Sequence, residues 1–350
     1  MCSLLLLTLL ICGFRVSLAQ QIITLDSAQV TKIWSQAAHS AFTDLARYKN
    51  NFYCAFREGD SHVSGSNSGK IRIIRSKDGK EWESVSLMEI AGLDLRDAKL
   101  SITPQNRIMV TMAGAVFQDG LVKELYPFVA FSDKSGLRFS APEKAVLDPA
   151  IVPTQDWIWR VTWHKGIGYG IDYQLKENGK NRSILPKDAW LAYVLKTTDG
   201  RHFDRVALLD IEDLPNEATI RFDKNDRMYV LVRREAKDLM GVMAESAFPY
   251  QDWQYHKLDF RLGGPNFLFL DDSRLVIGSR RFVVDDVFTG LMVTDLQGKV
   301  LKTIKLPSGG DNSYPGMLIY DKKLWVSYYS SHEGKTSIYL TQVPLDQLLK

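Results

Sequence analysis

The sequence predicts an all-β fold built from repeated sheets, and three observations support this prediction. Long amphipathic helix patterns are scarce in the 350 residues, and only the C-terminal run PLDQLLK is a fair helix candidate. Short runs rich in β-branched and aromatic residues recur instead between Asp, Asn, Gly and Pro turns. They are IRIIRS, RIMVTMA, YPFVAFS, MYVLVRR, RLVIGSR and LWVSYYS. A turn motif also repeats along the chain.

The turn motif has the form S-x-D-G-x-x-W at residues 76–82, where the sequence is SKDGKEW. Looser copies are SDKSGLRF at residues 132–139 and TTDGRHF at residues 197–203, each after an apolar run. Asp and Gly favour a tight hairpin, under which the terminal aromatic ring folds back. Such repetition, shared among four-stranded blades, predicts a β-propeller of about six blades. The predicted blade limits are near residues 30–88, 90–150, 155–210, 213–260, 263–306 and 308–345.

The N-terminal segment has the features of a secretory signal peptide. Residues 3–12 form an apolar run that ends before the small-residue site SLA at residues 17–19. Cleavage after this site leaves residues 20–350 as one propeller domain, secreted or periplasmic. The apolar run is too short to span a membrane. A lipoprotein anchor at Cys12 is less favoured, because Ile11 stands where that cleavage site needs a small residue.

Composition narrows the classes of function. The chain is 45% hydrophobic and 24% charged, which suits a folded domain with a full core. Its net charge is only +3 and its basic residues alternate with acidic ones, so the basic patch of a nucleic-acid-binding protein is lacking. Without the signal peptide only Cys54 remains, which excludes an internal disulfide and a thiolate metal site. No nucleotide-binding or H-E-x-x-H motif occurs, so we expect no cofactor and no metal, with a calcium site in a loop left open.

The S-x-D-G-x-x-W turn resembles the Asp-box of the sialidase (neuraminidase) superfamily, and two further segments are similar to that superfamily. NEATIRFDKNDRMYVLVRRE, residues 216–235, resembles the segment in which a glutamate precedes a strand ending in a functional arginine. SYPGMLIYDKKLWVSYYS, residues 313–330, resembles the segment of the nucleophilic tyrosine. The resemblance implies a six-bladed propeller of sialidase type. It also implies an exo-glycosidase that releases a terminal acidic sugar with retention.

On this resemblance Tyr314 takes the role of nucleophile and Glu217 the role of its base. Sialic acid carries a carboxylate on its anomeric carbon, which would repel an anionic nucleophile but not a neutral tyrosine. A phenol with a pKa near ~10 is a weak nucleophile, so a glutamate must accept its proton during attack. The two residues are far apart in sequence, but a propeller brings loops from different blades together around its axis.

The general acid has several candidates. Asp60 stands first, because its loop, residues 59–70, corresponds to the place where the family has an aspartate before the Asp-box. Asp97, in the second predicted blade, is its rival. His62 lies in the same loop as Asp60 and is a further candidate, since histidine transfers protons near neutral pH.

The resemblance also implies three arginines that hold the substrate carboxylate. Arg233, or its neighbour Arg234, and Arg280, or its neighbour Arg281, match two of them. The first has no counterpart, because the matching residues 39–45 read HSAFTDL. Arg57, in the segment AFREGD, which is similar to the family's F-x-E-G segment, is the first candidate to replace its charge, and Arg96 and Arg160 are the others.

Because the first of the three expected arginines has no counterpart, two other functions are also considered. One is a glycosidase or lyase that acts on a uronic-acid polysaccharide, with His62 and Tyr314 performing β-elimination. The other is a non-catalytic glycan-binding propeller. All three hypotheses share a carbohydrate partner, and Trp157, Trp159 and Trp163 are candidates either for sugar stacking or for core packing between blades.

Overall fold

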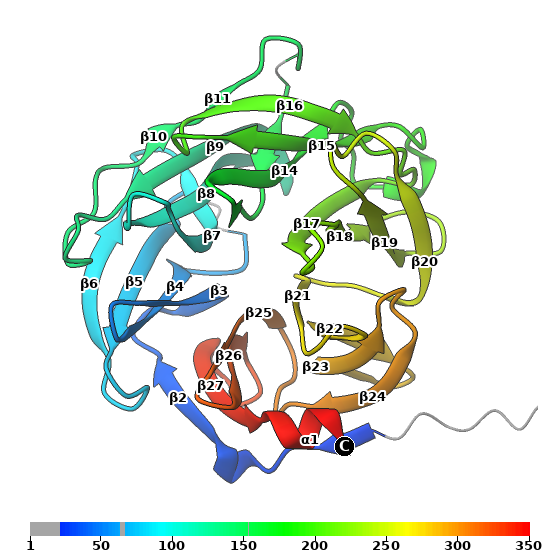
Figure 1. The fold of residues 1–350 in the computed structure, drawn as a ribbon. Coiled ribbons are helices and arrows are strands. Elements are labelled where there is room, and N and C mark those ends of the chain that lie inside the picture. The colour runs from blue at the N-terminus through cyan, green and yellow to red at the C-terminus, as the bar shows by residue number, and fades with distance from the viewer. Residues whose placement is uncertain (1–21, 64–66, 153) are drawn as a thin grey trace, which may run out of the picture.

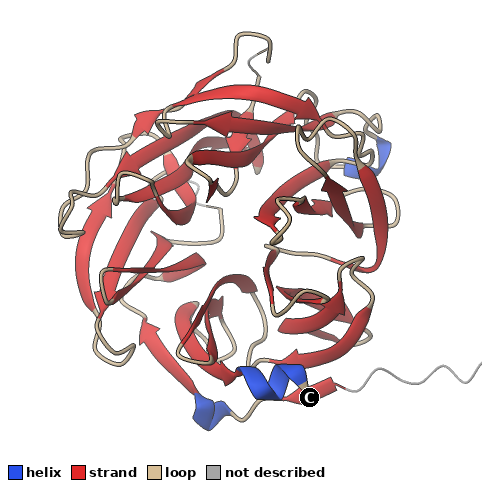
Figure 2. Cartoon of the chain, in the orientation of Figure 1, coloured by secondary structure: helices blue, strands red, loops and turns tan. Residues whose placement is uncertain are grey.

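The predicted six-bladed propeller is confirmed. The computed structural model describes residues 22–63, 67–152 and 154–350, and over these residues the strands form six sheets arranged in a ring (Figure 1). Figure 2 shows that strands dominate the chain and that helices are short and peripheral. The predicted signal peptide, residues 1–19, lies outside the described residues. No helix among the described residues is long and apolar enough to cross a membrane.

Each blade runs from an inner strand near the axis to an outer strand at the rim (Figure 1). Blade 1 contains β3 (His39–Tyr48), β4 (Asn51–Gly59), β5 (Lys70–Ser76) and β6 (Glu83–Met88). Blade 2 contains β7 (Asp94–Ile102), β8 (Ile108–Gln118), β9 (Leu121–Phe131) and β10 (Glu143–Lys144). Blade 3 contains β12 (Asp156–Ile158), β13 (Thr162–His164), β14 (Ile167–Leu175), β15 (Trp190–Thr197), β16 (His202–Leu208) and β11 (Val146–Leu147).

The second half of the ring follows the same pattern. Blade 4 contains β17 (Pro215–Phe222), β18 (Met228–Arg234), β19 (Met240–Ser246) and β20 (Gln254–Arg261). Blade 5 contains β21 (Asn266–Phe269), β22 (Arg274–Val283), β23 (Asp286–Asp295), β24 (Val300–Lys305) and β1 (Ile22–Thr24). Blade 6 contains β25 (Asn312–Tyr320), β26 (Lys323–Ser330), β27 (Ser337–Pro344) and β2 (Val30–Trp34). The short helices are η1 (Ser27–Gln29), η2 (Arg182–Ile184) and α1 (Leu345–Leu349), the last at the predicted C-terminal helix.

The N-terminal strands close the ring. β2 pairs antiparallel with β27 and completes blade 6, while β1 pairs parallel with β24 at the edge of blade 5. The prediction that blade 1 begins near residue 30 was therefore wrong, because β2 belongs to the last blade. This pairing covers two outer edges that would otherwise expose unpaired backbone groups, and it ties the two ends of the chain together.

The three repeated turns connect the third and fourth strands of blades 1, 2 and 3. In the first, Asp78 Oδ1 accepts from the backbone N–H of Lys80 at 2.8 Å and Ser76 Oγ accepts from that of Gly79 at 2.8 Å. The indole of Trp82 folds back and donates to the Gly79 carbonyl at 3.1 Å. Thr197 and Asp199 make the same backbone contacts in blade 3. The motif therefore builds the outer hairpins and lies away from the cavity described below.

Four inner strands carry a β-bulge at the same end of the ring. The pairing register shifts between Ala41 and Asp44, Arg96 and Lys99, Pro215 and Ala218, and Ser313 and Gly316. Three of these bulges hold a non-glycine residue at positive φ: Phe42 at 62°, Asp97 at 54° and Tyr314 at 51°. Such conformations cost about 1–3 kcal/mol each and are concentrated at functional sites. Because of these bulges, side chains of the inner strands of four blades point toward one end of the central axis.

Candidate active site

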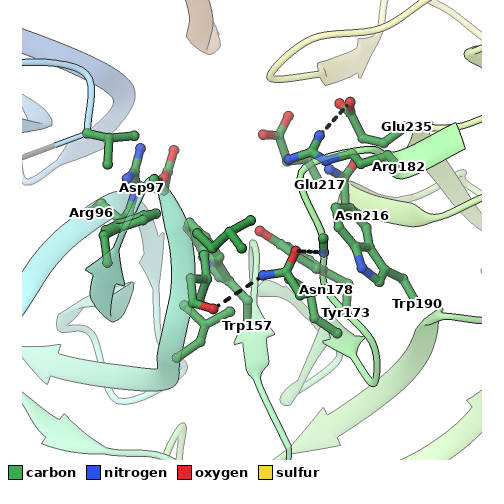
Figure 3. A pocket seen from close by; sticks show the side chains of 18 of the residues that line it. Arg96, Asp97, Trp157, Tyr173, Asn178, Arg182, Trp190, Asn216, Glu217 and Glu235 are labelled. Atoms are coloured by element: carbon green, nitrogen blue, oxygen red, sulfur yellow. Dashed lines mark hydrogen bonds and ion pairs between the residues drawn. The ribbon is translucent and has the colours of Figure 1, made fainter. Parts of the chain in front are cut away.

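A cavity of about 650 Å³ opens at the end of the axis where the bulges lie. Figure 3 shows Arg96 and Asp97 on one side and Glu217, Glu235 and Arg182 across from them, with Trp157, Tyr173 and Asn178 between. The lining residues are His62, Val63, Arg96, Asp97, Phe117, Asp119, Gly120, Leu121, Val122, Leu125, Trp157, Tyr173, Leu175, Asn178, Gly179, Lys180, Arg182, Trp190, Asn216, Glu217, Arg233, Glu235 and Tyr314. The cavity is thus built by inner strands and by the hairpins that follow the second strands, a position typical of binding sites in propellers.

Tyr314 and Glu217, 97 residues apart in sequence, are in direct contact in this cavity. The Tyr314 hydroxyl donates a hydrogen bond to Glu217 Oε1. Arg233 Nη1 lies 2.7 Å from Glu217 Oε2 and 3.2 Å from the Tyr314 hydroxyl oxygen. The backbone N–H of Gly264 donates to Glu217 Oε2 at 2.8 Å. One oxygen of the Glu217 carboxylate therefore accepts from the Tyr314 phenol, and the other is bound by the Arg233 guanidinium and the Gly264 amide.

Gly264 is required by the position of the Tyr314 ring. Its φ is +62°, and a Cβ at this position would lie 2.4 Å from Tyr314 Cδ2. No side chain larger than hydrogen fits there without moving the tyrosine. The glycine therefore lets the backbone pass close enough to the ring to donate to Glu217.

The ionisation states follow from burial and charge. Burial is the largest influence on Glu217 and opposes ionisation, but the charge of Arg233 and the hydrogen bonds from Tyr314, Arg233 and Gly264 outweigh it, so the pKa of Glu217 is lowered. Burial, reinforced by the negative charge of Glu217, raises the pKa of Tyr314 well above its usual value. The resting pair is thus a neutral phenol beside an ionised carboxylate, the arrangement that a base-assisted nucleophile needs.

Asp97 lies across the cavity from Glu217 on the bulge of β7 (Figure 3). Arg96 Nε lies 3.2 Å from Asp97 Oδ2, while Oδ1 is buried with no hydrogen-bond partner among the described residues. Burial raises the pKa of Asp97, and the charges of Arg96 and Lys99 offset this only in part. A carboxyl group with a raised pKa beside a cavity has the properties of a general acid.

Asp60, the other candidate for the acid, lies elsewhere. Its side chain is exposed in the loop that follows β4, and it is not among the described residues that line the cavity. His62, two residues further along this loop, does line the cavity, and Arg96 Nη2 approaches its carbonyl oxygen at 3.4 Å. Of the predicted acids and bases, the structure thus brings Asp97, His62 and Glu217 together with Tyr314.

The predicted arginines separate into two groups. Arg96 and Arg233 line the cavity, and Arg280 lies beside it with Cζ 6.0 Å from the centre of the Tyr314 ring. Arg57 is instead fully buried in a two-pronged ion pair with Asp94, at 2.6 and 2.9 Å. Arg160 Nη1 contacts both oxygens of Asp44, at 2.7 and 2.6 Å, and is likewise buried. Arg57 and Arg160 are absent from the described cavity lining, since aspartates on inner strands of other blades, Asp94 on β7 and Asp44 on β3, hold them inside the ring.

Arg96 contacts the segment of residues 39–45, in which the expected arginine is absent. Within that segment the Phe42 ring centre is 5.0 Å from the Tyr314 ring centre and 4.9 Å from Arg96 Cζ. Although burial lowers the pKa of Arg96, the charges of Asp97 and Asp94 reverse this and raise it overall, so its positive charge is retained. Arg96 of blade 2 thus places a positive charge beside the segment of blade 1 that lacks the expected arginine.

Lys99 is a site residue that the sequence analysis missed. Its side chain is buried, and its Nζ lies 4.6 Å from the Trp159 ring and 5.6 Å from the Tyr314 ring. Nζ has no hydrogen-bond partner in the part of the chain that the structure describes. Burial lowers its pKa to about 8. Strand alternation does not indicate this orientation, because the bulge before Lys99 breaks the period of two.

The three tryptophans of blade 3 have different surroundings. Trp157 lines the cavity and stacks on Tyr173, with ring centres 5.4 Å apart and planes 23° apart. Trp159 is buried, 5.9 Å from the Tyr314 ring, and Trp163 donates to Ser101 Oγ at 3.2 Å. Trp157 is largely buried, at 8% exposure, but contributes to the cavity wall, while Trp159 packs in the core beside Tyr314.

Comparisons with solved structures find the same architecture in other proteins. No protein-family model and no curated protein sequence matches the chain. A protein of unknown function from Dyadobacter fermentans superposes with a TM-score of 0.72 over 90% of this chain and 97% of that chain, at 17% identity. An α-L-arabinofuranosidase variant of Fusarium graminearum, in complex with an iminosugar inhibitor, has a TM-score of 0.65, 12% identity and coverage of 92% and 99%.

The sialidase of Trypanosoma rangeli in complex with sialic acid is also similar, with a TM-score of 0.62 at 9% identity. The match covers 90% of this chain and 56% of that chain. At these identities the similarity is one of fold. The chain therefore shares the six-bladed propeller architecture of sialidases and of this arabinofuranosidase.

Proposed function

We propose that this protein is a retaining glycoside hydrolase that releases a terminal acidic sugar from a glycan, with Tyr314 as nucleophile. The observation that carries the proposal is the hydrogen bond from Tyr314 to the ionised Glu217, in a cavity whose opposite wall holds Asp97. Both groups are buried and both line the cavity. They form the pair required for attack by a neutral nucleophile.

The first half of the reaction forms a glycosyl–tyrosine bond. Tyr314 Oη attacks the anomeric carbon while Glu217 Oε1 takes the phenol proton. Asp97 gives its proton to the glycosidic oxygen, and the bond between that oxygen and the anomeric carbon breaks. Arg233 lies close to both Glu217 and the Tyr314 oxygen, so its charge limits the build-up of negative charge during attack.

The second half releases the sugar. Asp97, now ionised, takes a proton from water as the water oxygen attacks the anomeric carbon. The Tyr314 oxygen leaves and recovers its proton from Glu217. Two displacements at the same carbon give retention of configuration.

Three arginines around Tyr314 support an acidic sugar as substrate. Arg96 and Arg233 line the cavity and Arg280 lies behind the ring. The pKa of each is raised above the usual arginine value, since burial is outweighed by nearby acidic groups and tyrosines. A sugar carboxylate beside Tyr314 would meet this positive charge, and Trp157 contributes an aromatic side chain to the cavity wall.

The structural neighbours and the N-terminal segment agree with this proposal. A sialidase and an α-L-arabinofuranosidase share the fold, so the fold is suited to glycoside hydrolysis. We further propose that the chain is exported, on the basis of the signal-peptide pattern at residues 1–19. Export would bring it to extracellular or periplasmic glycans.

The test is sugar release from a panel of sialosides, uronides and neutral glycosides, with NMR of the first product formed. We expect release of an acidic sugar with retained configuration. A fluorinated analogue of the active sugar should label Tyr314, which peptide mass spectrometry would detect. Inverted product or labelling of another residue would contradict the mechanism.

The same panel separates the other functions. An unsaturated product that absorbs in the ultraviolet would indicate β-elimination of a uronic acid, with His62 at the cavity wall as a proton-transfer group. Binding of glycans without any product would indicate a non-catalytic propeller.

A further inference from the structure

Three potential metal ligands from distant parts of the sequence meet at the edge of the cavity. They are His39 at the start of β3, His62 in the loop after β4, and Asp311 immediately before β25. Asp311 Oδ2 lies 2.9 Å from His39 Nε2 and 2.7 Å from His62 Nδ1. One ligand atom from each residue lies within 4.8 Å of the other two. Because Asp311 is 272 and 249 residues away from the two histidines, no spacing in the sequence indicates this cluster.

We propose that His39, His62 and Asp311 bind a divalent transition metal of the zinc type. Two imidazole nitrogens and one carboxylate oxygen form a ligand set that suits Zn²⁺ and its neighbours rather than Ca²⁺ or Mg²⁺. Bonds of about 2.0–2.2 Å require Asp311 Oδ2 to move apart from each histidine nitrogen by a small amount from the present hydrogen-bonding distances of 2.9 and 2.7 Å. Three protein ligands leave a coordination position for water or for a ligand.

Two of the three groups are already held in place. Asp311 Oδ1 accepts from the Tyr329 hydroxyl at 2.9 Å, and the Asp311 backbone N–H donates to Ser331 Oγ at 2.8 Å. These bonds leave Oδ2 facing the histidines. His39 is buried and pairs with Gly59 within blade 1. Hydrogen bonds that orient a ligating carboxylate in this way are a regular part of metal sites.

His62, the third group, makes the proposed metal site accessible from the cavity. The His62 side chain is 47% exposed and lines the cavity, whereas that of His39 is 8% exposed. A metal could therefore enter from the cavity side, and its open position would face solvent there. The histidine–aspartate pairs His164–Asp226 and His202–Asp199 each contain a single histidine, so they do not form comparable sites.

The position of the cluster has a consequence for substrate binding, which rests on the proposed function. The Phe42 ring lies 5.0 Å from the His62 ring and 5.0 Å from the Tyr314 ring. A metal ion beside His62 would add positive charge on the blade 1 side of the cavity, where residues 39–45 contain no arginine. The acidic group of the sugar is the natural ligand for its open position.

The proposal is tested by metal binding without any substrate, so its outcome does not depend on catalytic activity. Full-length protein freed of metal with a chelator is titrated with Zn²⁺ by calorimetry and with Co²⁺ by visible absorption. We expect one equivalent to bind, with a Co²⁺ spectrum that shows nitrogen and oxygen ligands. His62→Ala, which alters a half-exposed side chain, should weaken binding by at least about tenfold.

The matched control is His202→Ala, which removes the histidine of an exposed histidine–aspartate pair. It should bind both metals as the unaltered protein does. Failure of the unaltered protein to bind an equivalent, or equal binding by His62→Ala, would overturn the proposal. His39→Ala, checked for folding by circular dichroism, should reproduce the effect of His62→Ala.

Discussion

Phe42 and Tyr314 occupy equivalent places on two neighbouring blades, and only one of them can do chemistry. Each is the first residue of the bulge in its inner strand, each has positive φ, at 62° and 51°, and each is buried. The Tyr314 hydroxyl meets Glu217 and Arg233, whereas the Phe42 ring packs against Arg96 and His62. The strained bulge therefore belongs to the fold, and the proposed chemistry depends on a hydroxyl that faces a glutamate.

The largest effect is expected for Tyr314→Phe, which makes the two positions alike. We expect kcat to fall by at least about 1,000-fold, because the nucleophile is lost while the ring is kept. The midpoint of thermal unfolding should change little, since Arg233 and Gly264 still pair with Glu217. Sugar release and circular dichroism measure the two effects.

The reciprocal exchange, Phe42→Tyr combined with Tyr314→Phe, serves as the control. It should stay inactive, because the hydroxyl at position 42 has no Glu217 partner. Recovery of more than a small fraction of activity would mean that any phenol in the cavity suffices.

Asp97→Asn tests the proposed general acid, which lies on the bulge of β7. We expect kcat to fall by about 100- to 10,000-fold for a natural glycan, the usual contribution of general-acid catalysis. A substrate with an activated aryl leaving group needs no proton, so its hydrolysis should fall far less. An equal loss for both substrates would argue against this role for Asp97.

The pH dependence of kcat/KM follows from the same assignment. Burial raises the pKa of Asp97, so its protonated, active form persists above the usual aspartate range and activity falls as pH rises through the raised value. The pKa of Glu217 is lowered, so its ionised form is lost only below the usual glutamate range. The alkaline fall should disappear in Asp97→Asn, and its persistence there would assign it to another group.

Gly264→Ala should have a smaller but measurable effect on the Tyr314 side. The new methyl group would meet the Tyr314 ring, so the phenol must shift. A displacement on the order of 1 Å can lower kcat by about 100-fold, and overpacking costs about 1–3 kcal/mol of unfolding free energy. Kinetics and urea denaturation together measure both.

Gly166→Ala is the matched control, since Gly166 also has positive φ, at +85°, but a Cβ there would meet no atom within 4 Å. It should lower stability through backbone strain alone and leave kcat unchanged. A similar loss of kcat in both variants would show that the effect is not specific to Tyr314.

Phe42→Tyr alone should have the smallest effect on catalysis. We expect kcat to change by less than about threefold, because Tyr314 and Glu217 are untouched. A hydroxyl buried without a partner costs about 1–3 kcal/mol, so the free energy of unfolding should decrease. A large loss of kcat at unchanged stability would instead place position 42 in substrate binding.

Local patterns in the sequence were sufficient for the architecture. The alternating strands, the turn motif and its repetition predicted an all-β, six-bladed propeller, and the strand MYVLVRR coincides with β18 (Met228–Arg234). These features depend on near neighbours in the chain: hairpin turns set the pairing, and alternation sets the buried face. The exceptions are the two N-terminal strands, since β1 pairs with β24 and β2 pairs with β27, near the other end of the chain.

The composition of the site was decided by the tertiary structure. The sequence alone identified Tyr314 and Glu217 as a candidate pair through resemblance, but it ranked Asp60 above Asp97 and preferred Arg57 to Arg96 and Arg160. Which charged groups reach the cavity depends on bulges and on partners from other strands: Asp94 holds Arg57, Asp44 holds Arg160, and the β7 bulge presents Asp97 and Lys99. Such contacts join residues tens to hundreds of positions apart, so packing around the axis, and not local pattern, determines them.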